Sequence, residues 1–537
     1  MGDFETLAHL AAPSFGTPEF SSRAGEQLFF TADRLAFVTY IERLNGIVKA
    51  NDIRGLVPEE LDANLARALG GAAADVIVGA AGTNIAGRGA HQDTLGADHD
   101  GGSRSIIVGH DMRPSSPELA QAFAEGARRR GADVIMIGLC STDGLYHASG
   151  SLNSAGAMFT ASHNPAEYNG IKICAPGALP VGIESGLAEI RDLAGQYAEA
   201  GEVPSVETTG TYTERDTLRE YAEFLRGLVD LHQGRRLRIV VDAGNGMAGL
   251  TVPAVFEAAA GFEPLNVEII PLYFELDGTF PNHPANPLEP DNLRDLQDAV
   301  LNHEADLGLA FDGDADRCFV VDERGEPVNP SAVTILVGLR EVALEKNAGR
   351  EPIIIHNLIT SRAVPEIISA AGGTVVRTRV GHSFIKQEMA RTGAVFGGEH
   401  SAHYYFRDFY GADSGMLAAM HLLAAMKTVD APLSELVAEY HPYVPSGEIN
   451  SSVDDIAGAT QRVIRHLSAT EGVQIDDLDG LMVSHWHESP KWWVSLRASN
   501  TEPLLRLNIE AETAQTMQRI RDEVLALVRE EPGEETK

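Results

Sequence analysis

Three aspartates in this sequence have the spacing of a divalent metal site. Asp312, Asp314 and Asp316 place carboxylates at every second position between two apolar runs. Three like charges so close repel one another, so they require a cation. Carboxylate oxygens favour Mg²⁺, Mn²⁺ or Ca²⁺. A calcium EF-hand is the alternative because Glu323 falls at loop position twelve, but Arg317 stands at position six, where that loop needs glycine.

A serine hydroxyl lies in a second segment that could do chemistry, residues 159–165 (FTASHNP). Asn-Pro marks a turn, so we expect Ser162 on a tight loop with its side chain pointing outward, beside His163. The chain then brings a lysine, Lys172, back towards the serine. A serine-histidine pair alone is a weak signal, and the apolar run before it and the lysine after it strengthen it.

Three further polar segments could bind an anionic or hydroxylated substrate. Lys49 and Arg54 flank a turn-prone centre near the start of the chain. Glu399 and Ser401 follow a Gly-Gly turn and could hydrogen-bond vicinal sugar hydroxyls. Guanidinium groups match phosphate with two parallel hydrogen bonds, so a turn after the last strands predicts a phosphate site. That predicted site consists of Arg497, Ser499, Asn500, Thr501 and Arg506.

A strand–helix–strand pattern that occurs three times predicts the fold. Apolar strands begin near residues 105, 237 and 352, and each is followed by a helix, a glycine stop and a second apolar strand. These separations exceed the roughly 20–50 residues of solenoid repeats. We therefore predict an α/β protein with three tandem, related domains on mixed sheets and a C-terminal α+β domain. Each repeat is followed by one polar motif, so the motifs should meet in a central cleft beyond the strand ends.

The same pattern predicts where the domains begin and end. Residues 86–104, which have no apolar period, are predicted to form a surface insertion within the first domain. The predicted divisions are an N-terminal extension (1–43), a serine-loop domain (44–208), an aspartate-loop domain (209–325), a sugar-loop domain (326–442) and a phosphate-loop domain (443–537).

Composition limits the classes of partner. A chain of 537 residues is too long to fold around one hydrophobic core, so its length predicts about three or four domains. A formal net charge of −35 argues against binding nucleic acid or an acidic membrane, so a phosphate site must be a local cationic island. The three cysteines form no framework of paired spacings, and no apolar run reaches the roughly 18 residues of a membrane span. These features predict a cytoplasmic protein with no membrane partner.

Together the motifs resemble those of the α-D-phosphohexomutases of the phosphomannomutase/phosphoglucomutase type. Residues 159–165 resemble the phosphoserine loop, 312–317 (DGDADR) the Mg²⁺ loop, and 497–503 (RASNTEP) the phosphate loop. Residues 398–403 (GEHSAH) resemble the sugar loop, with Ala402 where the family usually has glycine. The resemblance runs from about residue 44 to about residue 530 in family order.

The resemblance implies roles for individual residues. Ser162 would carry the phosphoryl group, and it or its phosphate would share one Mg²⁺ with the three aspartates. Lys172, with a lowered pKa, is the first candidate for the base that moves the sugar hydroxyl proton, and His382 is the second. The implied catalytic set is Ser162, His163, Lys172, Arg54, Arg317 and His382, and the implied sugar-binding set is Glu399, Ser401 and His403.

The resemblance also implies a reaction. It predicts a mutase, a monomer or homodimer, that interconverts hexose 6-phosphate and hexose 1-phosphate through a hexose 1,6-bisphosphate, which also serves as activator. Mannose phosphate is the favoured substrate, and glucose phosphate should also be accepted. The alternatives are a phosphoglucosamine mutase and a metal-dependent sugar phosphatase, which would transfer the phosphoryl group to water. A sugar-phosphate sensor is a further alternative if Ser162 is never phosphorylated.

Overall fold

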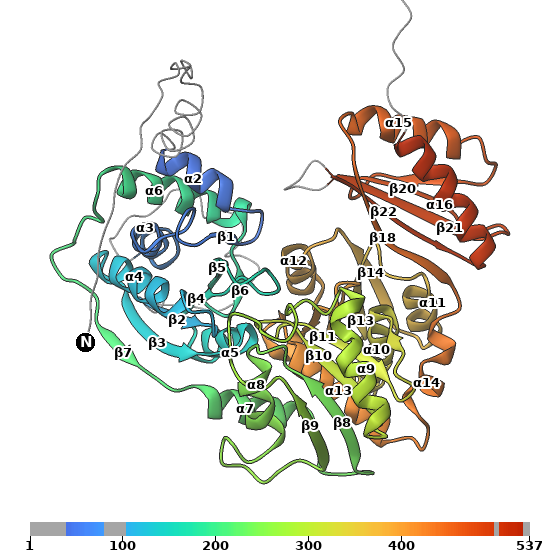
Figure 1. The fold of residues 1–537 in the computed structure, drawn as a ribbon, viewed down its shortest axis with the longest axis horizontal. Helices are drawn as coiled ribbons and strands as arrows, with labels where there is room; N and C mark the ends of the chain where they lie inside the picture. The colour runs from blue at the N-terminus through green and yellow to red at the C-terminus, as the bar shows by residue number, and fades with distance from the viewer. Residues whose placement is uncertain (1–38, 80–103, 499–503, 530–537) are drawn as a thin grey trace, which may run out of the picture.

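The computed structural model describes residues 39–79, 104–498 and 504–529, which form four sheets in succession along the chain (Figure 1). Three sheets are mixed and the fourth is antiparallel, so the predicted fold class is confirmed. The domain boundaries given above stay predictions. Ser499, Asn500 and Thr501, the insertion up to residue 103 and the extension up to residue 38 lie outside the described residues.

The first sheet places the serine loop between two neighbouring strands. Its strands are β1 (Ile53–Leu56), β2 (Ser105–His110), β3 (Asp133–Leu139), β4 (Ala155–Phe159), β5 (Tyr168–Ala175), β6 (Leu179–Pro180) and β7 (Tyr212–Glu214). Its helices are α2 (Tyr40–Ile47), α3 (Ala63–Ala73), α4 (Ser116–Arg129), α5 (Thr142–Leu152) and α6 (Leu187–Glu199). The order is β1-β5-β4-β2-β3-β7, with β6 on β5. Because β5 runs antiparallel to β4, residues 160–167 form the turn between them.

The second sheet places the aspartate loop in a similar turn. Its strands are β8 (Leu237–Asp242), β9 (Val267–Leu272), β10 (Leu307–Phe311), β11 (Cys318–Asp322) and β12 (Pro327–Val328), and its helices are α7 (Leu218–Leu228), α8 (Ala248–Phe256) and α9 (Arg294–Asn302). The order is β12-β11-β10-β8-β9, and β10 and β11 are antiparallel neighbours. Residues 312–317 join these two buried strands, so the helices of an EF-hand are absent from this loop.

The third sheet carries the predicted sugar loop. Its strands are β13 (Ile353–Asn357), β14 (Thr374–Thr378), β15 (Phe396–Gly398), β16 (Tyr404–Phe406) and β17 (Ala412–Asp413). Its helices are α10 (Pro330–Asn347), α11 (Ala363–Ala370), α12 (His382–Thr392), α13 (Gly415–Lys427) and α14 (Leu433–Leu436). Residues 399–403 connect β15 to its antiparallel neighbour β16. One continuous hydrophobic core joins this domain to the second.

The fourth domain stands apart from the first and packs on the third (Figure 1). Its strands are β18 (Val444–Ser452), β19 (Gln474–Asp476), β20 (Leu481–His485), β21 (Trp492–Ala498) and β22 (Leu504–Ala511), in the order β18-β22-β21-β20-β19. Helices α15 (Ile456–Leu467) and α16 (Ala514–Val528) cover one face of this sheet with an apolar core. No helix among the described residues is long and apolar enough to cross a bilayer.

Candidate active site

The serine loop and the aspartate loop meet at hydrogen-bonding distance. The Ser162 Oγ donates to Asp312 Oδ2 across 2.6 Å, although 150 residues separate them in the chain. A side chain at Gly313 would lie 2.5 Å from the Ser162 carbonyl oxygen, so only glycine permits this approach. Ser162 is 3 % exposed and has a φ of 51°, in the left-handed region. The predicted outward-pointing side chain is therefore wrong, because the second domain covers the serine.

The three aspartates form a compact acidic cluster. One carboxylate oxygen from each of Asp312, Asp314 and Asp316 lies within 4.8 Å of the others, and all three side chains are buried. The Oδ1 atoms of Asp314 and Asp316 are buried and accept no hydrogen bond among the described residues. Buried, unpaired carboxylate oxygens are costly unless a cation binds them. These donors fit a hard divalent cation, so the cluster could hold the predicted metal ion.

Lys172 lies between two of these carboxylates. Its Nζ donates to Asp314 Oδ2 across 2.7 Å and to Asp316 Oδ2 across 2.5 Å. Burial acts to lower the pKa of Lys172, but the two carboxylates outweigh it and raise the pKa above its usual value. The lowered pKa expected for a general base is therefore not found, because both carboxylates stabilise the charged amine.

Burial and these contacts shift the pKa values of the three aspartates in different directions. Burial, with the charge of Asp314 beside it, raises the pKa of Asp316 to about 6. Burial also raises the pKa of Asp312, although Arg317 opposes the shift. Burial acts in the same direction on Asp314, but Lys172 holds its pKa below the usual value. Asp314 is therefore the member of the cluster most strongly held as a carboxylate.

Two arginines approach the serine from different domains. Arg317 Nη2 donates to the Ser162 Oγ across 3.0 Å and to Asp312 Oδ2 across 2.8 Å, and it also contacts His163 Nδ1. Arg54 donates to Asp52 across 2.8 Å and to the Asn164 Oδ1 across 2.6 Å. Both guanidinium groups therefore border the serine loop, and the roles predicted for them stay predictions.

The third domain adds its loop to the same cluster. The backbones of Arg317 and His403 pair as an isolated bridge, and His403 Nε2 lies 3.8 Å from Asp316 Oδ1. Ser401 Oγ and His403 Nδ1 are 2.8 Å apart. Ala402, which stands where the family usually has glycine, has a φ of 62° in the left-handed region.

Two further predicted residues of the third domain have well-defined surroundings. The buried Glu399 carboxylate accepts hydrogen bonds from Asn357, Gly381 and Tyr405. Burial and the nearby Lys386 charge lower the pKa of His382 to about 4, and its Nδ1 has no partner among the described residues. His382 is therefore a neutral imidazole with a free ring nitrogen.

The fourth domain presents two arginines side by side. Arg497 and Arg506 are directly opposite each other on β21 and β22. Glu448 lies 3.8 Å from a terminal nitrogen of each guanidinium group, and neither Nε has a hydrogen-bond partner among the described residues. Like charges opposite each other on neighbouring strands are unfavourable unless an anion binds between them. This pair is suited to phosphate.

Comparison with known proteins gives the family. Models of the four domains named phosphoglucomutase/phosphomannomutase match residues 45–200 (domain I), 219–325 (domain II), 331–443 (domain III) and 448–527 (C-terminal domain). The chain belongs to the phosphoglucomutase/phosphomannomutase family. A phosphomannomutase of Escherichia coli K12 is 37 % identical over 469 residues, covering 86 % of this chain and 94 % of the relative. A Xanthomonas campestris protein named phosphohexose mutases is 39 % identical over 466 residues, with the same coverage. The predictions of this family and of an isomerase are confirmed.

Two solved structures resemble this fold over most of the chain. A phosphoglucomutase/phosphomannomutase family protein from Burkholderia thailandensis has a TM-score of 0.74 at 29 % identity and covers 91 % of this chain and 98 % of its own. The open form of a Paramecium phosphoglucomutase has a TM-score of 0.64 at 18 % identity, covering 89 % of this chain and 94 % of its own. The second likeness shows the fold alone.

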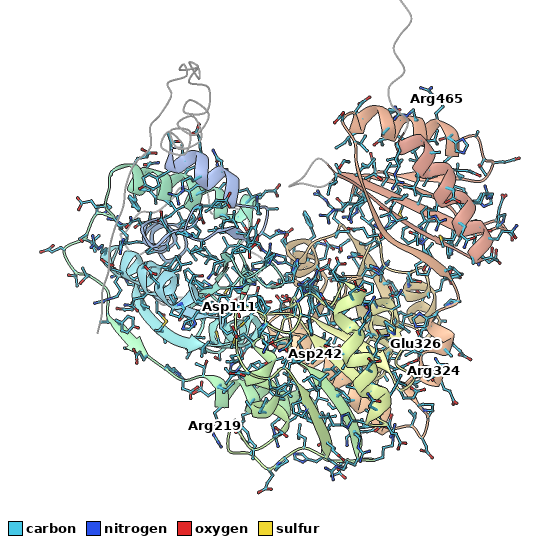
Figure 2. All side chains as sticks on the ribbon, viewed as in Figure 1. Asp111, Arg219, Asp242, Arg324, Glu326 and Arg465 are labelled. Carbon is cyan, nitrogen blue, oxygen red and sulfur yellow. The ribbon has the colours of Figure 1, made fainter. Side chains whose placement is uncertain are left out.

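The structure adds one residue of this phosphohexomutase site that sequence reasoning missed. Arg113 follows the end of β2, and its side chain lies beneath the serine loop with no exposed surface. Its guanidinium group donates to four backbone carbonyl oxygens, three in the loop and one at the start of β5, and its Nε lies 3.3 Å from Asp111 Oδ2. Asp111 is buried, and Figure 2 labels it on the side of the first domain nearest the second. An Asp-x-Arg sequence at a strand end was the available signal.

A second missed residue joins three domains close to the cluster. The buried Asp143 accepts hydrogen bonds from Ser141 of its own domain, Tyr221 of α7 and Ser414 at the start of α13. Its neighbour Thr142 donates to Asp314 Oδ2 across 2.6 Å. Asp143 therefore holds the start of α5 in the position from which Thr142 reaches the acidic cluster.

Proposed function

We propose that the protein interconverts hexose 6-phosphate and hexose 1-phosphate, with mannose phosphates as the favoured substrates and glucose phosphates also accepted. The observation that supports this most directly is the contact of 2.6 Å between the Ser162 hydroxyl and the aspartate cluster. It brings a nucleophile, carboxylates and Arg317 to one buried point where three domains meet. Phosphoryl transfer requires this kind of alignment and charge stabilisation.

The reaction consists of two transfers. In the first, the phosphorus–oxygen bond to phosphorylated Ser162 breaks, a new bond forms to a hydroxyl of the bound hexose monophosphate, and the hydroxyl proton passes to a base. The product is a hexose 1,6-bisphosphate. This intermediate turns over within the cleft, and its other phosphoryl group returns to the Ser162 oxygen while the proton returns to the new sugar hydroxyl.

Several residues around Ser162 would stabilise the negative charge of the phosphoryl group. Arg317 and Arg54 hold the non-bridging oxygens of the phosphoryl group, and Lys172 contributes a third positive charge. Asp312, Asp314 and Asp316 would hold Mg²⁺, which when bound would draw charge from the phosphoryl oxygens. These positive groups supply the cationic island that a chain with a net charge of −35 needs around an anionic substrate.

The surroundings of Lys172 and His382 support different roles for the two candidate bases. Lys172 stays charged while Asp314 and Asp316 face it, so it is suited to holding oxygens or to giving a proton to the departing seryl oxygen. Burial keeps the pKa of His382 at about 4, so its imidazole is neutral and is the remaining candidate for accepting the proton of the sugar hydroxyl. The proposed assignment reverses the order expected from the sequence, and the two carboxylates that keep Lys172 charged support it.

The remaining polar residues bind the rest of the substrate. Ser401, His403 and Glu399 face the sugar ring, and the hydrogen bonds that Glu399 already accepts fix its carboxylate in place. The paired Arg497 and Arg506, with residues 499–501, hold the phosphate that is not being transferred. This division of the substrate between two phosphate sites allows the bisphosphate to bind in either orientation.

Coupled assays with three sugar 1-phosphates in the presence of Mg²⁺ test the proposed substrate. Mannose 1-phosphate should give the highest kcat/KM and glucose 1-phosphate a lower but measurable one. A large preference for glucosamine 1-phosphate would identify the protein as a phosphoglucosamine mutase instead. Free phosphate that accumulates in place of the isomer would identify a phosphatase.

A further inference from the structure

A polar cavity of about 560 Å³ lies between the third and fourth domains. Arg362, at the start of α11, and Arg377, on β14, line it from the third domain. The fourth domain contributes five residues from β19 and β20, namely Gln474, Ile475, Asp476, Met482 and Ser484. None of these residues belongs to the candidate active site. The volume falls within the range of small-molecule sites.

Arg362 brings an unpaired positive charge to this cavity. Its guanidinium group makes no hydrogen bond or ion pair with any described residue, and its Nε is buried. The group is placed by stacking, since its Cζ lies 5.7 Å from the ring centre of Trp486. An arginine that is held in place without a hydrogen-bonded anionic partner keeps the donors of its terminal nitrogens for a ligand.

The carboxylates near Arg362 at the interface of the third and fourth domains accept hydrogen bonds from other donors. Glu510 accepts from the Trp493 indole and from the Arg362 backbone N–H. Glu366 accepts from the Trp486 indole and from the Tyr443 hydroxyl. Neither carboxylate therefore pairs with the Arg362 side chain.

Arg377 brings a second guanidinium group that is only partly used. Its Nη2 bonds to Asp476, and its Nη1 contacts the Met482 sulfur across 3.5 Å. The remaining donors are free for an anion. The charges of the two arginines repel, which together with burial lowers the pKa of Arg362. Among the residues that line the cavity, one carboxylate, Asp476, stands against two guanidinium groups, and Glu510 and Glu366 act on Arg362 from outside the lining.

We propose that this cavity is a second phosphate-binding site, which takes a phosphate group, free or as the ester of a small metabolite. Arg362 and Arg377 clamp the phosphate from the third domain, and the Ser484 hydroxyl donates to it from the fourth. The bound anion joins the two domains. It thereby holds the fourth domain, which carries Arg497 and Arg506, at one angle to the third. Phosphate bound here would regulate access to the cleft.

Equilibrium dialysis of the full-length protein with ³²P-labelled inorganic phosphate counts the sites. The wild-type protein should bind one more phosphate per chain than the Arg362→Gln variant and than the Arg377→Gln variant. The control is Arg391→Gln, whose side chain is 66 % exposed and paired with Glu388 on α12. It should bind as much phosphate as the wild type. Equal binding by the wild type and Arg362→Gln would overturn the proposal.

Tryptophan fluorescence places the bound phosphate, because the three tryptophans of the chain, Trp486, Trp492 and Trp493, all lie in the fourth domain. Phosphate titrated against chloride at constant ionic strength should change the emission. The midpoint should rise by at least about tenfold in Arg362→Gln, which loses a charge-assisted pair of hydrogen bonds. Arg506→Gln, which weakens the cleft, should keep the wild-type midpoint. A midpoint that moves with Arg506 alone would assign the phosphate to the cleft and refute the proposal.

A competition experiment tests whether the ligand of this cavity is a sugar phosphate ester or free phosphate. Hexose 6-phosphate that displaces the labelled phosphate from the Arg506→Gln protein would identify a sugar ester as the ligand. Retention of the label would identify free phosphate. Either result supports the site only if Arg362→Gln abolishes that binding, and it contradicts the site if Arg362→Gln does not.

Discussion

Arg113 Nη2 donates to the carbonyl oxygen of Ser162 across 3.0 Å. The same guanidinium group donates to the carbonyl oxygens of Asn164, Pro165 and Tyr168 across 2.7, 2.7 and 2.9 Å. One buried arginine thus holds three points of the loop that carries the proposed nucleophile, and the first residue of the strand that follows it. Because Ser162 has a left-handed backbone conformation, which costs free energy for a residue other than glycine, the loop needs such support to keep its shape.

The Arg113→Lys variant should lower kcat with little change in KM. Lysine offers three donors on one nitrogen and cannot reach four carbonyl oxygens spread along a turn. A displacement of the Ser162 oxygen by about 1 Å costs on the order of 10²-fold in rate. Steady-state kinetics of the coupled assay measure both constants. The matched control is Arg130→Lys, another arginine of the first domain, paired with Asp75 across 2.8 Å. Equal losses in the two variants, or a loss confined to KM, would show that Arg113 does not position the serine.

Asp143 should make stability depend on pH. Burial raises its pKa to about 6, in spite of the three hydroxyl groups that donate to it. A carboxyl whose folded pKa exceeds its unfolded value of about 4 destabilises the fold as it ionises. Asp143 therefore contributes its full share to the free energy of unfolding below about pH 4, where it is protonated in both states. This contribution decreases as the pH rises to about 6, by about 3 kcal/mol in total.

The comparison of wild type with Asp143→Asn isolates this effect. Thermal midpoints measured from pH 5 to 7.5 should fall with rising pH in the wild type relative to the variant, and the difference should become constant above about pH 7. Parallel profiles would contradict the assignment. The variant Asp298→Asn, on the exposed face of α9, should follow the wild type throughout.

The aspartate cluster should bind the metal that the reaction needs. Asp314→Asn should reduce activity by about 10³-fold or more, since it removes the carboxylate most strongly held in its charged form. Chelation of the wild type should have the same effect, and Mg²⁺ should reverse it. The rise in thermal midpoint on adding Mg²⁺, which measures binding independently of turnover, should disappear in Asp314→Asn and remain in Asp298→Asn. A variant that keeps the full Mg²⁺-dependent rise would exclude Asp314 as a ligand.

The sequence alone predicted the parts of the site that are contiguous in the chain. Residues 159–165 and 312–317 each fill a turn between adjacent antiparallel strands, so their spacing reflects their geometry directly. The repeated strand–helix–strand units predicted three related domains, because each unit follows local rules of chain direction and handedness.

Contacts between residues far apart in the chain could not be predicted from the sequence. Arg113 acts on carbonyl groups about fifty residues away, and Asp143 bonds to Ser414, 271 residues away. Only an Asp-x-Arg sequence at a strand end marks Arg113, and no motif marks Asp143. The burial of Ser162 and the raised pKa of Lys172 have the same origin, since the second domain supplies both the cover and the carboxylates.

The mass of the purified protein tests the central proposal, that Ser162 carries the phosphoryl group. The wild type, incubated with hexose 1,6-bisphosphate and Mg²⁺, should be about 80 Da heavier than its sequence mass, the mass of one phosphoryl group on a serine. Ser162→Ala should lack the added mass and the mutase activity, whereas Ser468→Ala, at the exposed end of α15, should keep both. An unmodified wild type, or a Ser162→Ala variant that still isomerises hexose phosphate, would contradict the proposed mechanism.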